Sequence, residues 1–195
     1  MRMNERAKGR RDSDVWKGLA AGLVGGLVAS VVMNQFQKLC GKLMAGEEKS
    51  HGAQSLQKGT PQHGAGGMLQ ERGSDDEQDD AAERLANTIS IGVFDHELTR
   101  SEKDTAGTAL HYAYGISMGG LYGAAAELMP QVTIGAGALY GAGIWVVADE
   151  GVVPALGLSK SATEYPLSIH AYALASHLVY GLTAEVVRGA ARRAL

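Results

Sequence analysis

Five ionisable side chains lie in or beside long apolar stretches of the chain: His111, Asp149, Glu150, His170 and His177. Ionisable groups inside a bilayer are costly and are candidate functional sites by default. Imidazole nitrogens and carboxylate oxygens together can bind a cation or relay protons. One hypothesis is therefore a polar cluster of His111, His177, Asp149 and Glu150. The simpler alternatives are neutral imidazoles that hydrogen-bond neighbouring helices and carboxylates at solvated helix ends.

His170 and His177 are seven residues apart. Because an α-helix has about 3.6 residues per turn, both histidines fall on one face of a helix. We expect this face to point into a helix bundle. The ordinary pKa of histidine lies close to neutral pH, so the face would gain charge when the external pH falls. The spacing suggests a response to acid, with packing as the alternative role.

The sequence lacks the patterns expected for catalysis, metal binding and nucleic-acid binding. It has no helical His-x-x-x-His pair for zinc, no Gly-x-Ser-x-Gly nucleophile and no glycine-rich phosphate loop in its required context. Its single cysteine, Cys40, cannot form an internal disulfide. The net charge of -3 gives no basic field for nucleic acid. We predict no enzymatic activity, no metal, no cofactor and no nucleic-acid partner.

Glycines at intervals of four residues occur in three apolar stretches. This spacing places glycines on one helix face, where the missing side chains let two backbones approach closely. In a bilayer such contacts stabilise helix pairs by dispersion, because lipid gives no hydrophobic drive between helices. The sequence therefore predicts glycine-zipper packing by Gly18, Gly22, Gly26, Gly115, Gly119, Gly123, Gly137 and Gly141.

Four apolar runs, at residues 18–36, 105–126, 131–148 and 165–184, contain these residues. A bilayer crossing takes roughly 20 mostly apolar helical residues, which each run supplies. None shows the polar stripe of a helix on the surface of a soluble protein. The alternatives are a buried helical core in a soluble protein and, for the first run, a cleaved signal peptide after a basic leader.

Basic residues precede the first run and follow the fourth. The positive-inside rule therefore places both chain ends in the cytoplasm, which requires an even number of crossings. The predicted organisation is a basic cytoplasmic segment 1–14, transmembrane helices 15–39, 105–129, 131–150 and 164–187, external loops 40–80 and 151–163, a segment 81–104 before the second crossing, and a basic cytoplasmic tail 188–195.

The predicted external segments differ in composition. Residues 40–80 are rich in Gly, Gln, Ser and Asp and have few large apolar side chains, so we predict a disordered loop. In residues 81–104, Leu85, Ile89, Val93 and Phe94 fall near one helix face, opposite Glu83, Arg84, Asn87 and Glu97. This pattern predicts an amphipathic helix followed by a linker. The helix either lies on the membrane surface or packs on the ends of the bundle.

Three blocks of the sequence carry a family resemblance: HYAYGISMGGLYG, GAGALYGAGIWVVADEGVVPALGL and SHLVYGLTAEVVR. Together with a glycine-rich first helix behind a basic leader, they resemble the YagU-like family of bacterial inner-membrane proteins. The resemblance covers about residues 15–36 and 81–192. It implies a small multi-pass protein of the bacterial inner membrane and supplies no catalytic residue.

The pattern H-x-x-Y-G occurs twice, at residues 111–115 and 177–181. The two copies fall in the second and fourth runs, which would cross the membrane in the same direction. A parallel duplication of a two-helix unit would produce this arrangement. An internal repeat is therefore a hypothesis, with chance recurrence of a short motif as the alternative.

These observations predict an all-α integral membrane bundle of four transmembrane helices with glycine-zipper packing and one amphipathic surface helix. Its main partner would be the lipid bilayer, and we also consider a homo-oligomer. The function expected is a non-enzymatic role in the bacterial inner membrane, of structural or acid-stress type. The alternative is an oligomeric proton or cation transporter that uses the intramembrane histidines and acidic residues.

Overall fold

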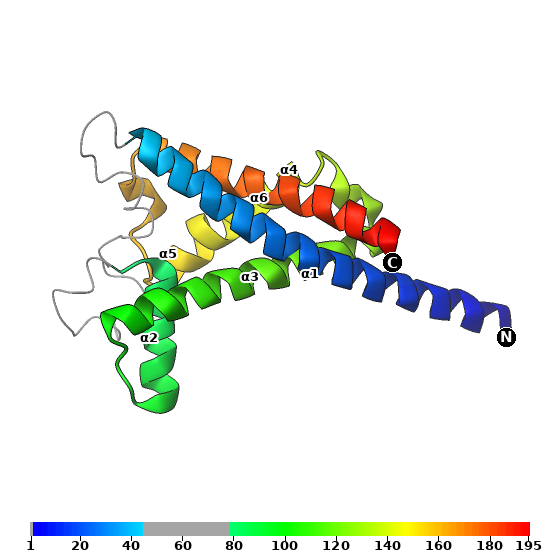
Figure 1. Cartoon of the computed structure of the whole chain (residues 1–195), viewed down its shortest axis with the longest axis horizontal. Helices are drawn as coiled ribbons and strands as arrows, with labels where there is room; N and C mark the ends of the chain where they lie inside the picture. Colours follow the sequence, from blue (N-terminus) through cyan, green and yellow to red (C-terminus); the bar gives the residue numbers. More distant parts are fainter. Residues whose placement is uncertain (1, 45–78) are drawn as a thin grey trace. The chain divides into compact units, whose positions relative to one another are not determined.

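The computed structural model describes residues 2–44 and 79–195. Its α-helices are α1 (Arg2–Met44), α2 (Ala81–Phe94), α3 (Arg100–Leu128), α4 (Ala138–Ile144), α5 (Val153–Ala155) and α6 (Leu167–Ala194) (Figure 1). Trp145–Val152 is π-helical, and Pro130–Thr133 and Ala162–Glu164 are 3-10 turns. No strand occurs in these two described ranges, so the predicted all-α class is confirmed.

The helices extend beyond several of the predicted boundaries. α1 begins at Arg2 and ends at Met44, so it includes most of the segment 1–14 and the first residues of the predicted loop 40–80. The rest of that loop, residues 45–78, lies outside the described residues. α2 occupies the first part of the segment 81–104. α3 and α6 overlap most of the second and fourth predicted crossings.

The third predicted crossing, residues 131–150, is not one regular helix. Pro130 starts a 3-10 turn, and three successive residues then have positive φ angles: Gly135 (76°), Ala136 (53°) and Gly137 (86°). Positive φ suits glycine because it has no Cβ. Helical structure resumes at Ala138 and continues through the π-helical segment to Ala155. Asp149 and Glu150 therefore lie inside a helix and not at its end.

One helix is long and apolar enough to cross a membrane. It is the Asp14–Gly41 part of α1, with 28 residues and a mean hydropathy of 1.7. Within the described residues no other helix meets the same criterion, so the crossing by four helices stays a prediction. Two of the predicted crossings miss the criterion for physical reasons. His170 and His177 make α6 less apolar, and the residues with positive φ interrupt the third run.

The chain divides into two compact units. The first unit consists of Met1–Phe36, Tyr112–Gly143 and Ser176–Leu195, and the second of Gln37–His111 and Ile144–Ala175. We call them the glycine unit and the polar unit, after the contacts described below.

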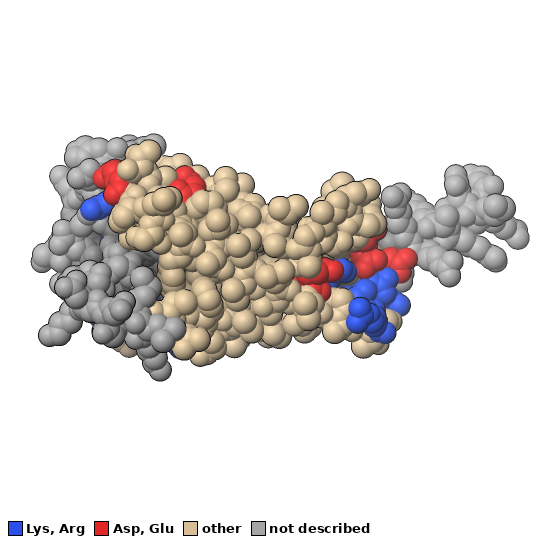
Figure 2. Space-filling model, turned by 90° about the horizontal axis from the view of Figure 1, so that it is seen from above, with Lys and Arg blue, Asp and Glu red and all other residues tan. Residues whose placement is uncertain are grey.

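In the glycine unit, parts of α1, α3 and α6 run side by side (Figure 1). The buried side chains are mostly small, namely Ala21, Ala29, Ser30, Ala126, Ser176 and Ala184, together with Met33, Tyr122 and Tyr180. On the face drawn in Figure 2, charged atoms gather at the end of this unit near the C-terminus, and the adjoining surface has no Asp, Glu, Lys or Arg. Most of the buried side chains are therefore small, and charge is confined to one end.

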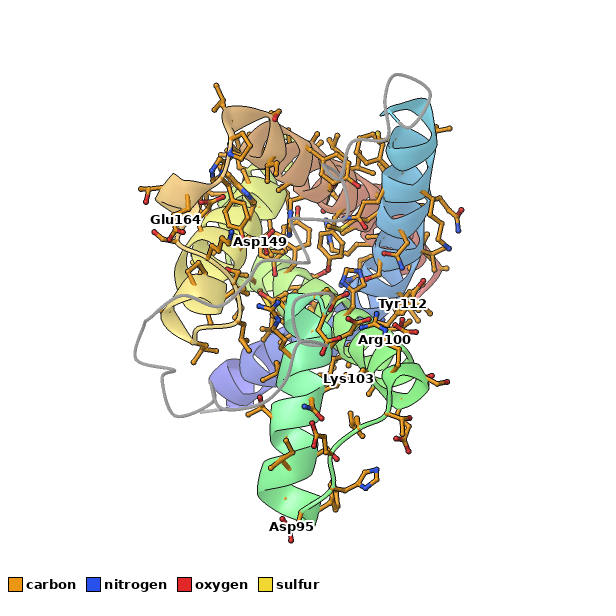
Figure 3. All side chains as sticks on the ribbon, turned by 90° about the vertical axis from the view of Figure 1, so that its left-hand side faces the viewer. Asp95, Arg100, Lys103, Tyr112, Asp149 and Glu164 are labelled. Carbon is orange, nitrogen blue, oxygen red and sulfur yellow. The ribbon has the colours of Figure 1, made fainter. Side chains whose placement is uncertain are left out.

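In the polar unit, α2 turns its polar side inward. Its buried residues are Glu83, Arg84, Ala86 and Ser90, whereas Val93 and Phe94 are exposed. Asp80 caps the helix: its side chain accepts from Glu83 N at 2.8 Å, and Glu83 in turn accepts from Asp80 N at 2.8 Å. Such a reciprocal capping box satisfies two otherwise unpaired donors of a helix start. Figure 3 shows Asp95 at the far tip of α2, well away from Arg100 and Lys103.

Candidate functional site

The glycines of α1 lie against those of α3 in the glycine unit. A Cβ built on Gly22 would be 2.2 Å from the carbonyl oxygen of Gly119, and one built on Gly119 would be 2.5 Å from the Cα of Gly26. Gly18 meets Gly123, and Gly26 meets Gly115, in the same way. Six of the eight predicted packing glycines thus form one continuous contact of backbone on backbone, as the interval of four residues requires.

The other two predicted glycines contact α6. A Cβ on Gly141 would lie 2.0 Å from the carbonyl oxygen of His177, and a Cβ on Gly137 would lie 2.2 Å from that of Gly181. Gly137 reaches this position from the left-handed turn before α4 and not from within a helix. Gly181, which belongs to the second H-x-x-Y-G pattern, is the partner that the sequence analysis did not include among the packing residues.

Two tyrosines add hydrogen bonds between the helices of this unit. Tyr180 on α6 donates its hydroxyl to the carbonyl of Gly115 on α3 at 2.5 Å, and Tyr140 on α4 donates to the carbonyl of Met118 at 2.7 Å. A helix carbonyl can accept such a second bond because each carbonyl oxygen has two lone pairs. These bonds give a structural role to Tyr180 and Gly115, one residue from each copy of the H-x-x-Y-G pattern.

The charged residues at the end of the glycine unit are paired. Arg192 Nε donates to Glu127 Oε1 at 2.7 Å, and Arg192 Nη2 donates to Asp14 Oδ1 at 2.9 Å. Arg188 makes two bonds to Glu185, at 2.7 and 2.8 Å. The hydrogen bonds to Glu127 and Glu185 raise the pKa of Arg192 and Arg188. Glu127, near the end of α3, therefore takes part in an ion pair that joins three helices.

His170 contacts another of the candidate polar residues, Glu150. Its Nδ1 lies 2.7 Å from Glu150 Oε1, and its Nε2 lies 2.9 Å from the carbonyl oxygen of Ala162. The rings of Trp145 and Tyr165 meet the imidazole edge-on, each with a centroid distance of 6.4 Å. Both the π-helical segment and α6 belong to the polar unit at these positions. The structure thus brings together two of the five candidates.

The hydrogen-bond partners of His170 define where protons lie. A carbonyl oxygen only accepts, so Nε2 must carry a proton toward Ala162. One further proton lies between Nδ1 and the Glu150 carboxylate, which gives either imidazolium with carboxylate or imidazole with carboxylic acid. In both forms the pair is neutral as a whole and holds one exchangeable proton. This is the chemistry that a proton relay would use.

The cluster of four residues stays a prediction. His111, Asp149 and Glu150 belong to the polar unit, and His177 belongs to the glycine unit. The partner found for Glu150 is His170, which the sequence analysis had assigned to a separate histidine face. A signal for this pair was present: a short loop joins the third and fourth runs, so residues near that loop on both runs must lie close together.

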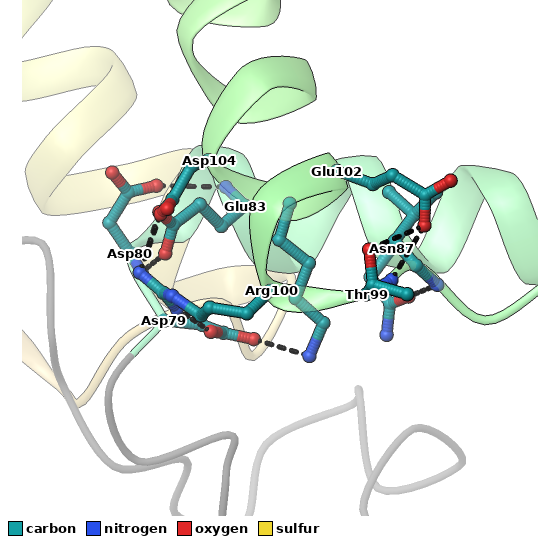
Figure 4. A network of polar contacts seen from close by, with 10 residues as sticks. Asp79, Asp80, Glu83, Asn87, Thr99, Arg100, Glu102 and Asp104 are labelled. Carbon is teal, nitrogen blue, oxygen red and sulfur yellow. Dashed lines mark hydrogen bonds and ion pairs between the residues drawn. The ribbon is translucent and has the colours of Figure 1, made fainter.

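A network of charged residues at the start of α2 and α3 escaped the sequence analysis (Figure 4). Lys103 Nζ lies 2.7 Å from Asp79 Oδ2, and Arg100 pairs with the other oxygen of Asp79. Arg100 also lies 3.1 Å from Glu83 and 2.7 Å from Asp104. Asp79, Glu83 and Lys103 are buried. Their spacing in the sequence resembles that of a solvated charged face, which is why they were not identified.

The pKa directions of this network follow from burial and from the neighbouring charges. Burial raises the pKa of the Glu83 carboxyl, and the donated backbone N–H of Asp80 offsets only part of that effect. Burial alone would lower the pKa of Arg100, but the carboxylates of Glu83, Asp104 and Asp79 outweigh it and raise the pKa. Glu102 lies outside the network, and the backbone N–H of Thr99 lowers its pKa.

Within the described residues, no group of three or more His, Cys, Asp or Glu side chains is arranged to hold a metal ion. The polar contacts there serve two kinds of role. The Asp79 network and the Arg192 cluster join helices, and the His170–Glu150 pair holds an exchangeable proton.

Glycine-packed helices, one of them long and apolar enough to cross a membrane, define an all-helical protein with a candidate membrane span. The chain belongs to the DUF1440 family, described as proteins of unknown function, which matches residues 64–186. The match includes the first two sequence blocks quoted above, most of the third and part of the polar segment, and it omits α1. No curated protein and no solved structure matches the chain. The finer resemblance to the YagU-like family stays a prediction.

Proposed function

We propose that the protein is a multi-pass protein of the bacterial inner membrane, of the YagU-like type, without enzymatic activity and with a structural role. The observation that carries the proposal is the inverted distribution of side-chain size in the glycine unit. Leu139 is 65% exposed and Val186 is 68% exposed, whereas most of the buried positions are alanine, serine or glycine. Water favours large apolar side chains inside, but lipid favours them outside and small residues between helices.

The proposed topology has four crossings with both ends in the cytoplasm. The charged end of the glycine unit supports this orientation, because Lys17, Arg188, Arg192 and Arg193 all come from the two terminal segments. Cytoplasmic flanks of membrane helices carry an excess of Lys and Arg. The loops 40–80 and 151–163 would then face the opposite side.

Cysteine labelling in spheroplasts tests this topology. In a Cys40→Ala background, an impermeant thiol reagent should label Gln57→Cys and Thr163→Cys and should spare Arg10→Cys and Arg193→Cys until the cells are lysed. Labelling at both ends from outside would invert the orientation. Different outcomes at the two ends would require an odd number of crossings, and labelling at none of the four positions in intact spheroplasts would place all of them inside the cell.

A proton or cation transporter is the second candidate, and the His170–Glu150 contact favours it. The pair holds one exchangeable proton and lies in the third and fourth proposed crossings. Purified protein in liposomes should then carry a proton flux that Glu150→Gln abolishes, since glutamine keeps the size of the side chain but cannot bind the proton. Equal flux in wild-type, Glu150→Gln and protein-free liposomes would exclude transport and leave the structural or acid-stress role.

A further inference from the structure

α2 is built with its apolar residues on the outside of the polar unit. Phe94 is 74% exposed and Val93 is 67% exposed, and Ile89, one turn earlier, is exposed as well. We call these three residues the apolar edge of α2. The same helix buries Glu83, Arg84 and Ser90. A helix of a water-soluble protein has the opposite arrangement, because burial of charge is costly and burial of apolar surface is favourable.

The orientation of α2 is fixed by contacts on its polar side. The capping box holds its first turn, Glu83 pairs with Arg100 at 3.1 Å, and Arg84 Nη1 donates to the carbonyl of Leu158 at 3.2 Å. In the middle of α2, Asn87 Oδ1 accepts from Leu98 N at 2.9 Å and ties the loop that follows the helix back to it. Rolling α2 to bury its apolar edge would break the contacts with Arg100 and Leu158, so the edge stays exposed.

We propose that the apolar edge of α2 inserts into the interfacial layer of a bilayer with zwitterionic headgroups. The proposal rests on the membrane location proposed above. With 14 residues α2 is too short to cross a bilayer, but a helix with one apolar face lies in the interface with that face among the acyl chains. Asp95 and the exposed Glu97 follow Phe94 directly and would mark the level of the headgroups.

The charges around α2 select the headgroup. Residues 79–104 contain seven acidic and three basic side chains. The basic ones, Arg84, Arg100 and Lys103, already donate to groups inside the unit. The segment also holds one histidine, His96, whose Nε2 lies 3.5 Å from Glu102. No Lys or Arg of this segment is therefore left to attract anionic lipid, whereas the carboxylates of Asp95 and Glu97 suit the cationic ammonium groups of zwitterionic lipid.

A second copy of the chain is a poorer occupant for this surface. Stable protein interfaces bury about 800 Å² on each partner, and three side chains at one end of a short helix offer much less. Binding to a lipid surface requires no minimum interface area, because each apolar side chain that inserts contributes its own free energy.

Spin labelling of the full chain in phosphatidylcholine vesicles tests the inference. In a Cys40→Ala background, a nitroxide is placed at Phe94→Cys or, as a second position on the edge, at Val93→Cys. Glu97→Cys is the matched control just beyond the edge. Leu121→Cys, on the exposed side of α3 in the glycine unit, reports on the proposed membrane crossing. Each label is measured for collisions with oxygen, which concentrates in lipid, and with a nickel chelate, which stays in water.

The expected result is that oxygen exceeds nickel at positions 93, 94 and 121 and that nickel exceeds oxygen at position 97. Exchange of phosphatidylcholine for phosphatidylglycerol should lower the oxygen collisions at position 94. Nickel in excess at 93 and 94 with oxygen in excess at 121 would overturn the inference and leave the membrane location standing. Nickel in excess at 121 would overturn the proposed function as well.

Two other results would also contradict the inference. Protection from both reagents at position 94, with spin–spin broadening that disappears when unlabelled protein is added, would identify a second copy as the occupant. Insertion that occurs only with phosphatidylglycerol would contradict the argument from charge.

Discussion

The two units of the molecule differ in the contacts that stabilise each of them internally. In the glycine unit, α1 and α3 approach so closely that a Cβ on Gly22 would overlap the carbonyl of Gly119. In the polar unit, α2 and α3 are joined by buried charges, with Lys103 2.7 Å from Asp79. The first kind of contact depends on the absence of side chains, and the second depends on long side chains with complementary charge.

This difference shows how each unit would respond to its surroundings. Close backbone contacts gain dispersion energy whether water or lipid lies outside, so the glycine contacts between α1 and α3 should be indifferent to pH and salt. A buried ion pair is stable only while both partners are present and charged, because removal of one leaves the other desolvated. The polar unit should therefore be sensitive to single charge changes, and the comparison leads to three predictions.

The largest effect is expected for Asp79→Ala. The side chain of Asp79 is only 2% exposed and that of Lys103 is 8% exposed, so the substitution removes a carboxylate that two cations share. Breaking a buried ion pair in this way costs about 3–5 kcal/mol. Denaturant unfolding of the full chain in detergent should show a loss of this size in the free energy of unfolding.

Asp104→Ala is the matched control for Asp79→Ala. Asp104 also pairs with Arg100, at 2.7 Å, but its side chain is exposed. An exposed ion pair contributes roughly 0–1 kcal/mol. Equal losses in the two variants would mean that burial does not set the strength of this network and would remove the contrast between the units.

The sequence predicted much of the glycine unit and little of the polar unit. Glycines at an interval of four define a helix face whatever the partner is, so their role in packing could be inferred before the partner was known. The Asp79 network depends on how residues 79–83 and 100–104 meet in space, and the same charges would be found on a solvated surface. A pattern of periodicity contains no information that separates these two cases.

The contact between His170 and Glu150 could be predicted from the sequence only in part. The sequence identified both Glu150 and His170 as candidates but paired neither with the other. The π-helical segment Trp145–Val152 changes the direction in which Glu150 points relative to a regular α-helix. Since a π-helix has no reliable sequence signal, the 2.7 Å contact to His170 required the structure.

The second prediction concerns Gly119→Leu in the glycine unit. A Cβ at this position meets three backbone atoms, Gly22 O and Gly26 Cα at 2.5 Å and Gly26 N at 2.6 Å. Backbone atoms cannot move aside as a flexible side chain would, so α1 and α3 must separate. We expect a loss of about 3 kcal/mol, the upper end of the usual range for overpacking, measured by thermal unfolding in detergent.

Gly143→Leu provides the control for Gly119→Leu. Gly143 is also in a helix, and a Cβ there has no atom within 4 Å. The change should be neutral or slightly stabilising, because leucine has the higher helix propensity. Loss of stability in both variants would point to a general intolerance of leucine and would remove the evidence for a close contact at Gly119.

The smallest effect expected is a pH dependence that arises from Glu83. Burial raises the pKa of this carboxyl above its ordinary value of 4.5, so between that value and the raised one the folded state binds more protons than the unfolded state. Stability must then fall as the pH rises through the folded pKa. Wild-type protein should lose stability over this interval, whereas Glu83→Gln should lose less, because glutamine does not titrate.

The difference in slope between wild type and Glu83→Gln is the quantity to measure, since the substitution also changes the capping box and the contact with Arg100. A shift of one pKa unit corresponds to only about 1.4 kcal/mol, which places this effect below the other two. Glu102→Gln is the control: the lowered pKa of Glu102 acts in the opposite direction and below 4.5, so this variant should keep the wild-type slope above that pH. Identical slopes in wild type and Glu83→Gln would contradict the burial of a titrating carboxyl and make the start of α2 as indifferent to pH as the glycine contacts.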